Sequence, residues 1–96
     1  MEVSRSAAAD LEQLIQTHSL PEDTKQRFRS AVRPLSRFPQ LGPELGGAWS
    51  GFRFVLGPWR WMLIVYVYLE DENRVVIVTV QDARSSRAAR SQKLTR

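Results

Sequence analysis

The stretch from Phe52 to Arg84 holds most of the β-branched and aromatic residues of this 96-residue chain, and it constrains the fold more than any other segment. Two apolar runs, residues 59–69 and 75–80, are separated by a charged turn at residues 70–74. Both runs are short and rich in Val, Ile, Tyr and Trp, which favours strands over one continuous helix. The pattern predicts an antiparallel β-hairpin, preceded by a shorter strand at residues 52–56.

The longer run also predicts which face of the sheet is covered by helices. Between residues 59 and 69 every odd position is apolar, whereas the even positions include Arg60, Tyr66 and Tyr68. Because strand side chains alternate between the two faces, we expect the helices on the odd face. The even face, with Arg60 at its start, is then open, and the hairpin returns Arg84 toward Arg60.

Two amphipathic segments precede the strands. Residues 6–17 have the apolar spacing of one helix face, with Asp10 turned outward. A second helix is predicted to begin at a serine cap, Ser19, because a glutamate follows three residues later and a proline lies in the first turn. It should extend to about Arg37, although Pro34 is expected to kink it or end it early.

These elements predict the α+β class, as an N-terminal two-helix hairpin packed on a small antiparallel sheet. Residues 39–51, rich in Gly and Pro, form the loop between the two parts, and residues 1–4 are a candidate edge strand. We expect a single domain at residues 1–84. Residues 85–96 form a basic C-terminal tail, since no acidic residue follows Asp82.

Composition narrows the class of protein. Hydrophobic residues make up 43% of the chain and charged residues 25%, which are ordinary proportions for a folded domain. The net charge of +4 indicates an anionic partner, either nucleic acid or an acidic protein segment. The chain has no cysteine, no apolar signal segment and no run long enough to cross a bilayer, so we expect a cytoplasmic protein without membrane contact.

Conventional catalytic and metal sites are hard to assemble from these residues. The single histidine, His18, falls in the turn between the predicted helices, where we expect an exposed, non-catalytic side chain. One histidine and no cysteine do not make the ligand set of a zinc site, so neither a metal nor another cofactor is expected. Ser85 and Ser86 have no neighbouring histidine or lysine that would activate a hydroxyl as a nucleophile.

Arginine is the residue type that remains. Arg53, Arg60 and Arg84 each lie on or next to a predicted strand, and the hairpin could bring them together on the open face. Guanidinium groups stay charged and donate hydrogen bonds in a planar fork that matches two phosphate oxygens. In the alternative interpretation each arginine pairs with a local carboxylate, such as Arg84 with Asp82, or packs its stem on the sheet.

The C-terminal half carries a resemblance. The segment Gly57-Pro58-Trp59-Arg60, the strand after it, the acidic turn, the Val/Ile strand and Asp82-Ala83-Arg84 together resemble the RelE/ParE toxin superfamily. The pattern of that family is Gly-x-Tyr-Arg, a strand, a turn, and a strand that ends on an arginine. The predicted two-helix hairpin and the chain length fit as well, so the resemblance spans nearly the whole chain and rests on order and spacing.

The resemblance implies a toxin of a type II toxin–antitoxin system, neutralised by a cognate antitoxin protein. RelE-like members cut messenger RNA in the ribosomal A site, whereas ParE-like members poison DNA gyrase and are not nucleases. For the nuclease, position in the family pattern implies catalytic roles for Arg60 and Arg84. Contacts with RNA are implied for Arg53, Arg87 and Arg90.

Two positions depart from the nuclease pattern. It has a lysine where this chain has Gly51 and a tyrosine where this chain has Arg90, so no general base is evident. An endoribonuclease that inhibits translation is the leading hypothesis. A gyrase inhibitor and a non-catalytic binding domain of the same fold remain as alternatives.

Overall fold

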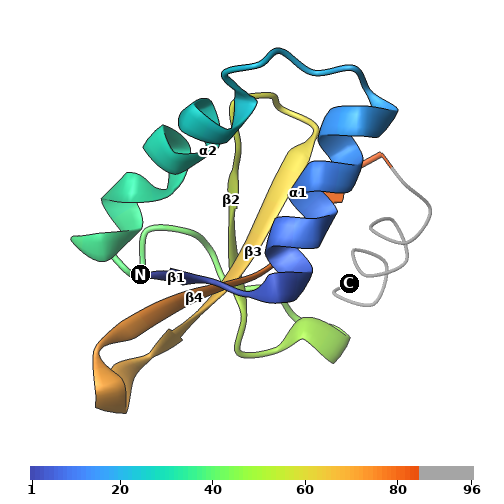
Figure 1. Cartoon of the computed structure of the whole chain (residues 1–96). Helices are drawn as coiled ribbons and strands as arrows, with labels where there is room; N and C mark the ends of the chain where they lie inside the picture. The colour runs from blue at the N-terminus through green and yellow to red at the C-terminus, as the bar shows by residue number, and fades with distance from the viewer. Residues whose placement is uncertain (85–96) are drawn as a thin grey trace.

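The computed structural model describes residues 1–84 as two helices on a four-stranded sheet of order β1-β4-β3-β2 (Figure 1). The elements are β1 (Glu2–Val3), α1 (Arg5–Thr17), α2 (Thr24–Val32), β2 (Arg53–Leu56), β3 (Met62–Leu69) and β4 (Arg74–Asp82). In Figure 1 α1 crosses in front of the sheet and α2 lies to the left of β2, while the tip of the β3–β4 hairpin extends below both helices. The predicted α+β fold is therefore confirmed. Over residues 1–84 no helix is long and apolar enough to span a membrane.

The predicted β-hairpin is present, and the predicted edge strand completes the sheet. β3 pairs with β4 in antiparallel register from Met62↔Asp82 to Leu69↔Arg74, and the register shifts between Val65 and Tyr66. β1 pairs with β4 in parallel, with Val3 opposite Ile77. The sheet is consequently mixed rather than wholly antiparallel, because β1 is added to the side of β4 that does not pair with β3.

The helices begin and end at residues set by local chemistry. The Ser4 hydroxyl accepts a hydrogen bond from the amide of Ala7 at 3.0 Å and caps α1. The prediction that Ser19 caps the second helix was wrong: Ser19 has φ of 50° and belongs to the turn that ends α1, while α2 begins at Thr24. The expected effect of Pro34 is confirmed, since α2 ends at Val32 and Pro34 lies in a 3-10 turn.

The expectation that the helices cover the odd face was wrong. The side chains of Met62, Ile64 and Tyr66 are 0% exposed and form the core with α1 and α2, so the even face is the covered one. Arg60 had suggested a polar even face, but it precedes β3 and lies in the turn before it. The odd residues Leu63 and Val65 are also buried, so both faces of β3 are shielded from solvent along its first half.

Asp10 does not point into solvent as expected from helical periodicity. Its carboxylate oxygen Oδ2 accepts hydrogen bonds from the Thr79 hydroxyl at 2.6 Å and from the Val80 amide at 3.2 Å. β1 is only two residues long and leaves the end of β4 without a strand neighbour on that side. Asp10 of α1 therefore accepts hydrogen bonds from the edge of β4 beyond the point where its pairing with β1 stops.

Candidate functional site

Arg60 and Arg84 come from two chain segments that meet at one end of the sheet. Arg60 is exposed in the turn before β3, and Arg84 follows the end of β4. The amide of Ala83 donates to the carbonyl of Trp61 at 2.6 Å, which extends the ladder past the last strand pair, Met62↔Asp82. The turn holding Arg60 and the residues leading to Arg84 are thus joined directly by the backbone.

The guanidinium of Arg84 is bound to a carboxylate. Its Nε donates to Oδ1 of Asp82 at 3.0 Å, and its Nη2 donates to Oδ2 at 3.1 Å. The same guanidinium lies 5.0 Å from the centroid of the Trp61 ring, in cation–π geometry. The hydrogen bond from the Arg84 side chain lowers the pKa of Asp82 below its ordinary value, against the opposing effect of partial burial. The local pairing weighed as an alternative from the sequence is therefore present.

His18 also reaches this end of the sheet. Its Nε2 lies 3.4 Å from Oδ2 of Asp82, and its ring centroid lies 4.6 Å from that of Trp61. The histidine is the C-terminal cap residue of α1, and its side chain is 29% exposed. His18 lies in the turn as expected, but its side chain is not fully exposed, because the end of α1 packs against the end of β4. We call His18, Trp61, Asp82 and Arg84 the sheet-end cluster.

An indole surface continues from the sheet-end cluster. Trp59 stacks on Trp61 with ring centroids 6.2 Å apart. Arg27 of α2 lies 6.0 Å from the Trp59 ring centroid. Aromatic rings interleaved with arginines are the chemistry with which proteins bind single-stranded nucleic acid, since bases stack on the rings while guanidinium groups contact phosphates.

Arg53 does not join this surface. It pairs with Tyr66 across β2 and β3, four positions from Met62, which corresponds to about 13 Å along the strand. Its guanidinium donates to the carbonyl of Gly42 at 2.8 Å and lies 3.4 Å from the Glu44 carboxylate. Arg53 therefore fastens the loop before β2. The predicted RNA contacts Arg87 and Arg90 and the basic tail lie outside the described residues.

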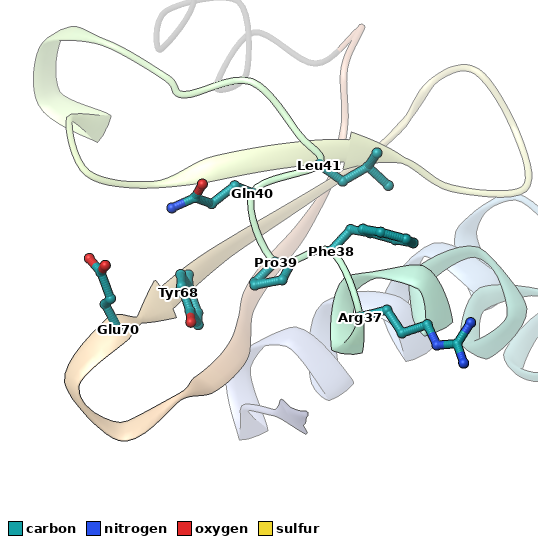
Figure 2. A pocket seen from close by; sticks show the side chains of 7 residues that line it. All are labelled: Arg37, Phe38, Pro39, Gln40, Leu41, Tyr68 and Glu70. Carbon is teal, nitrogen blue, oxygen red and sulfur yellow. The ribbon is translucent and has the colours of Figure 1, made fainter.

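A separate groove lies near the other end of β3. The segment 37–41 forms one side of it, and Tyr68 and Glu70 form the other (Figure 2). Phe38 and Leu41 are 59% and 58% exposed. None of the three predicted arginines Arg53, Arg60 and Arg84 lines the groove. It is thus distinct from the sheet-end cluster.

Comparison with known protein families identifies the chain. Residues 1–87 match the family described as the ParE toxin of type II toxin–antitoxin system, parDE. The chain belongs to the ParE toxin family. The family match covers every described element and both Arg60 and Arg84, and it implies a cognate antitoxin as a partner of this toxin. No curated protein matches the chain.

The sheet-end cluster differs in its members from the site that the sequence predicts. The structure brings Arg84 to Trp61, adds His18 and Asp82, and leaves Arg53 elsewhere. Gly51, where the nuclease pattern has a lysine, is exposed at φ of 93° and offers no side chain. Over residues 1–84, no three side chains of His, Asp or Glu are grouped as metal ligands. The chemistry available at the described site is that of guanidinium, indole, imidazole and carboxylate groups.

Proposed function

We propose that this ParE-family toxin is a cytoplasmic endoribonuclease that cleaves messenger RNA in the ribosomal A site. The observation that supports this proposal is the contact of the Arg84 guanidinium with the Trp61 indole, on which Trp59 stacks. The turn that holds Arg60 is joined to the segment before Arg84 by a backbone hydrogen bond. Phosphate-binding and base-stacking groups are then available together, as cleavage of a single strand requires.

Cleavage of this type uses the 2′-hydroxyl of the RNA to attack the adjacent phosphate, so the protein must stabilise negative charge on the phosphorane. Arg60 is exposed and makes no ion pair with any residue of the described part of the chain. Arg84 uses Nε and Nη2 for Asp82, and the two hydrogens on Nη1 remain available to a phosphate oxygen. We expect each arginine to stabilise the transition state by about 3 kcal/mol, which is the stabilisation typical of one oxyanion-hole donor.

The test is pulse labelling of protein and DNA synthesis in bacteria after induction of the toxin. The wild-type chain should stop protein synthesis promptly, and Arg60→Ala should relieve the arrest. Arg37→Ala is the matched control, because Arg37 is an exposed arginine that lines the separate groove. Continued growth with the wild-type chain would contradict the proposal and favour a non-catalytic binding domain.

Gyrase inhibition is the second candidate function. It is favoured by the bidentate pairing of Arg84 with Asp82, which offsets the charge that a phosphate would attract, and by the ParE description of the matched family. In that case translation continues after induction while DNA synthesis fails and a DNA-damage response rises. Arg60 and Arg84 are then binding residues for the gyrase surface.

We also propose that the cognate antitoxin covers the exposed apolar side chains of the groove. Phe38 and Leu41 lie close together there and are more than half exposed, which is costly for large apolar groups in water. Phe38→Ser and Leu41→Ser should weaken antitoxin binding in isothermal titration while leaving toxicity intact. Unchanged affinity in both variants would assign the antitoxin to another surface.

A further inference from the structure

We infer that three exposed arginines along α2 and the turn after it, Arg29, Arg33 and Arg37, bind an acidic segment of the cognate antitoxin. The inference rests on the proposed placement of the antitoxin in the groove, and it extends that site along α2. It holds whether the toxin acts on messenger RNA or on gyrase. We call these three residues the arginine row.

The spacing of the arginine row places its members side by side. Residues four apart on a helix are neighbours on its surface. Arg29 lies in α2, Arg33 begins the 3-10 turn that follows, and Arg37 is the C-terminal cap residue of that turn. All three residues are exposed. The buried positions of the same segment, which belong to the core, are Phe28, Val32 and Leu35. The row therefore faces solvent while the apolar positions anchor the helix.

The segment that carries the arginine row has no acidic residue. Residues 24–38 contain five cations and no carboxylate, although the net charge of the whole chain is only +4. The two cations outside the row are paired, Lys25 with Glu12 at 2.8 Å and Arg27 with Asp23 at 2.9 Å. No member of the row makes an ion pair with any of residues 1–84. The row is thus a positive surface that favours an anionic partner.

Apolar surface lies at both ends of the arginine row. At one end Arg37 lines the groove, and Phe38 beside it is 59% exposed. Figure 2 shows the side chains of these two residues extending to the same side of the chain. At the other end Arg29 lines a hollow formed by β1, α1 and α2. The apolar residues of this hollow are Val3, Ala8, Leu11 and Phe28. A ligand that covers the row therefore also meets apolar surface.

This combination fits an acidic protein segment better than a nucleic acid. Carboxylates pair with guanidinium groups, and apolar side chains of the same segment can enter the groove and the hollow. A phosphate backbone would pair with the arginines but leave Phe38 and the apolar hollow in water. The family match implies one protein partner, the cognate antitoxin. We therefore assign the row to an antitoxin segment whose acidic side chains lie between apolar ones.

The test measures binding of the full-length toxin to the full-length protein encoded by the adjacent gene, by surface plasmon resonance. Arg33→Glu reverses the charge in the middle of the row, and we expect it to slow association by about tenfold at about 0.1 M salt. In about 1 M salt, where the Debye length is about 3 Å, the difference should shrink to less than about twofold. Arg33→Lys keeps the charge and should keep most of the association rate.

Arg5→Glu is the matched control for this test. Arg5 is an exposed arginine at the start of α1, and its substitution changes the net charge by the same amount as Arg33→Glu. We expect the control to change the association rate by less than about twofold, because it lies outside the proposed surface. Equal Tm values of the two variants show that neither has lost its fold.

The outcomes separate this inference from the proposed placement in the groove. Equal association rates for Arg33→Glu and Arg5→Glu would overturn the role of the row, and weaker binding of Phe38→Ser would still support the groove. Slow association of Arg33→Glu together with unchanged binding of Phe38→Ser and Leu41→Ser would support the row and overturn the groove.

Three further results would overturn the inference. The first is a wild-type toxin that does not bind the adjacent-gene protein, which overturns the groove proposal as well. The second is a difference between Arg33→Glu and wild type that stays the same in about 1 M salt, because the row would then not act through charge. The third is unchanged antitoxin binding in Arg33→Glu with loss of binding to single-stranded oligothymidylate or of toxin self-association. That result would assign the row to a nucleic acid or to a second copy of the chain.

Discussion

The buried hydroxyl of Tyr66 accepts a hydrogen bond from the backbone amide of Gly42 at 3.0 Å. Tyr66 is 0% exposed in the middle of β3, and Gly42 lies in the loop before β2. This one contact joins the core of the sheet to the long loop that crosses it, and Arg53 binds the carbonyl of the same glycine.

Removing the hydroxyl of Tyr66 should leave the amide of Gly42 buried without a partner. We expect Tyr66→Phe to lower the free energy of unfolding by about 2 kcal/mol, the cost of one unsatisfied buried donor. The control is Tyr68→Phe, whose hydroxyl bonds to exposed Asn73, and which should change stability by less than about 0.5 kcal/mol. Urea denaturation of both variants measures the difference, and equal losses would contradict the importance of the Gly42 contact.

A side chain at Gly42 should disrupt the docking of the loop. A Cβ atom there would lie 2.0 Å from the carbonyl oxygen of Phe54, which is backbone and cannot rotate away. We expect Gly42→Ala to lower the free energy of unfolding by at least about 3 kcal/mol. In Gly51→Ala the new Cβ meets no atom within 4 Å, so only the strain of a φ of 93° remains. We expect that strain to lower the free energy of unfolding by about 1 kcal/mol. Thermal denaturation that ranks the two variants the other way round would be incompatible with this packing.

The pairing of Asp82 with Arg84 predicts a loss of stability in acid. Because the folded state lowers the pKa of Asp82, mainly through the Arg84 side chain, its contribution is present above the pKa of the unfolded chain and disappears as the pH falls through the folded value. Wild type should therefore exceed Arg84→Gln in Tm at pH 7, and the gap should narrow below the ordinary aspartate value of 3.8. A gap that stays constant down to pH 2 would assign the effect of Arg84 to Trp61 alone.

Asp10 should contribute more to stability than an exposed carboxylate of the same helix. Asp10→Ala leaves the Thr79 hydroxyl and the Val80 amide without their acceptor, and we expect a loss of about 2 kcal/mol. Glu12→Ala removes an ion pair with Lys25 in which both side chains are at least half exposed. That control should cost less than about 1 kcal/mol. Chemical denaturation in parallel checks both, and similar losses would mean that Asp10 is not needed at the edge of β4.

The helices and strands could be predicted from the sequence, but which face of the sheet the helices cover could not. The composition of residues 59–80 is decisive for strands, and Pro34 is decisive for the end of α2. The covered face depended on whether the phenol of Tyr66 could be buried, which in turn depends on a donor 24 residues away in the chain. Periodicity within one strand does not contain that information.

The candidate site was predicted only in part for the same reason. Arg60 and Arg84 are joined by strand pairing, which follows from the hairpin. His18 reaches Asp82 through the packing of α1 on β4. The sequence held one signal of this packing, because His18 follows Leu11 and Leu14 at the spacing of one helix face. It held no signal that Asp82 lies opposite that face. The position of Arg53 could not be predicted, because its partners in the loop are backbone carbonyl groups that the sequence does not reveal.

The parallel pairing of β1 with β4 has a consequence for the synthesis of the toxin. Ser4 bonds to Val78 across 74 positions of sequence, and His18 meets Asp82 across nearly as many. A nascent chain lacks both contacts until β4 has left the ribosome exit tunnel, because interactions between distant segments form only after both are free. β1 and the end of α1 therefore depend on β4, and the sheet-end cluster is absent from any nascent chain in which β4 is still inside the tunnel.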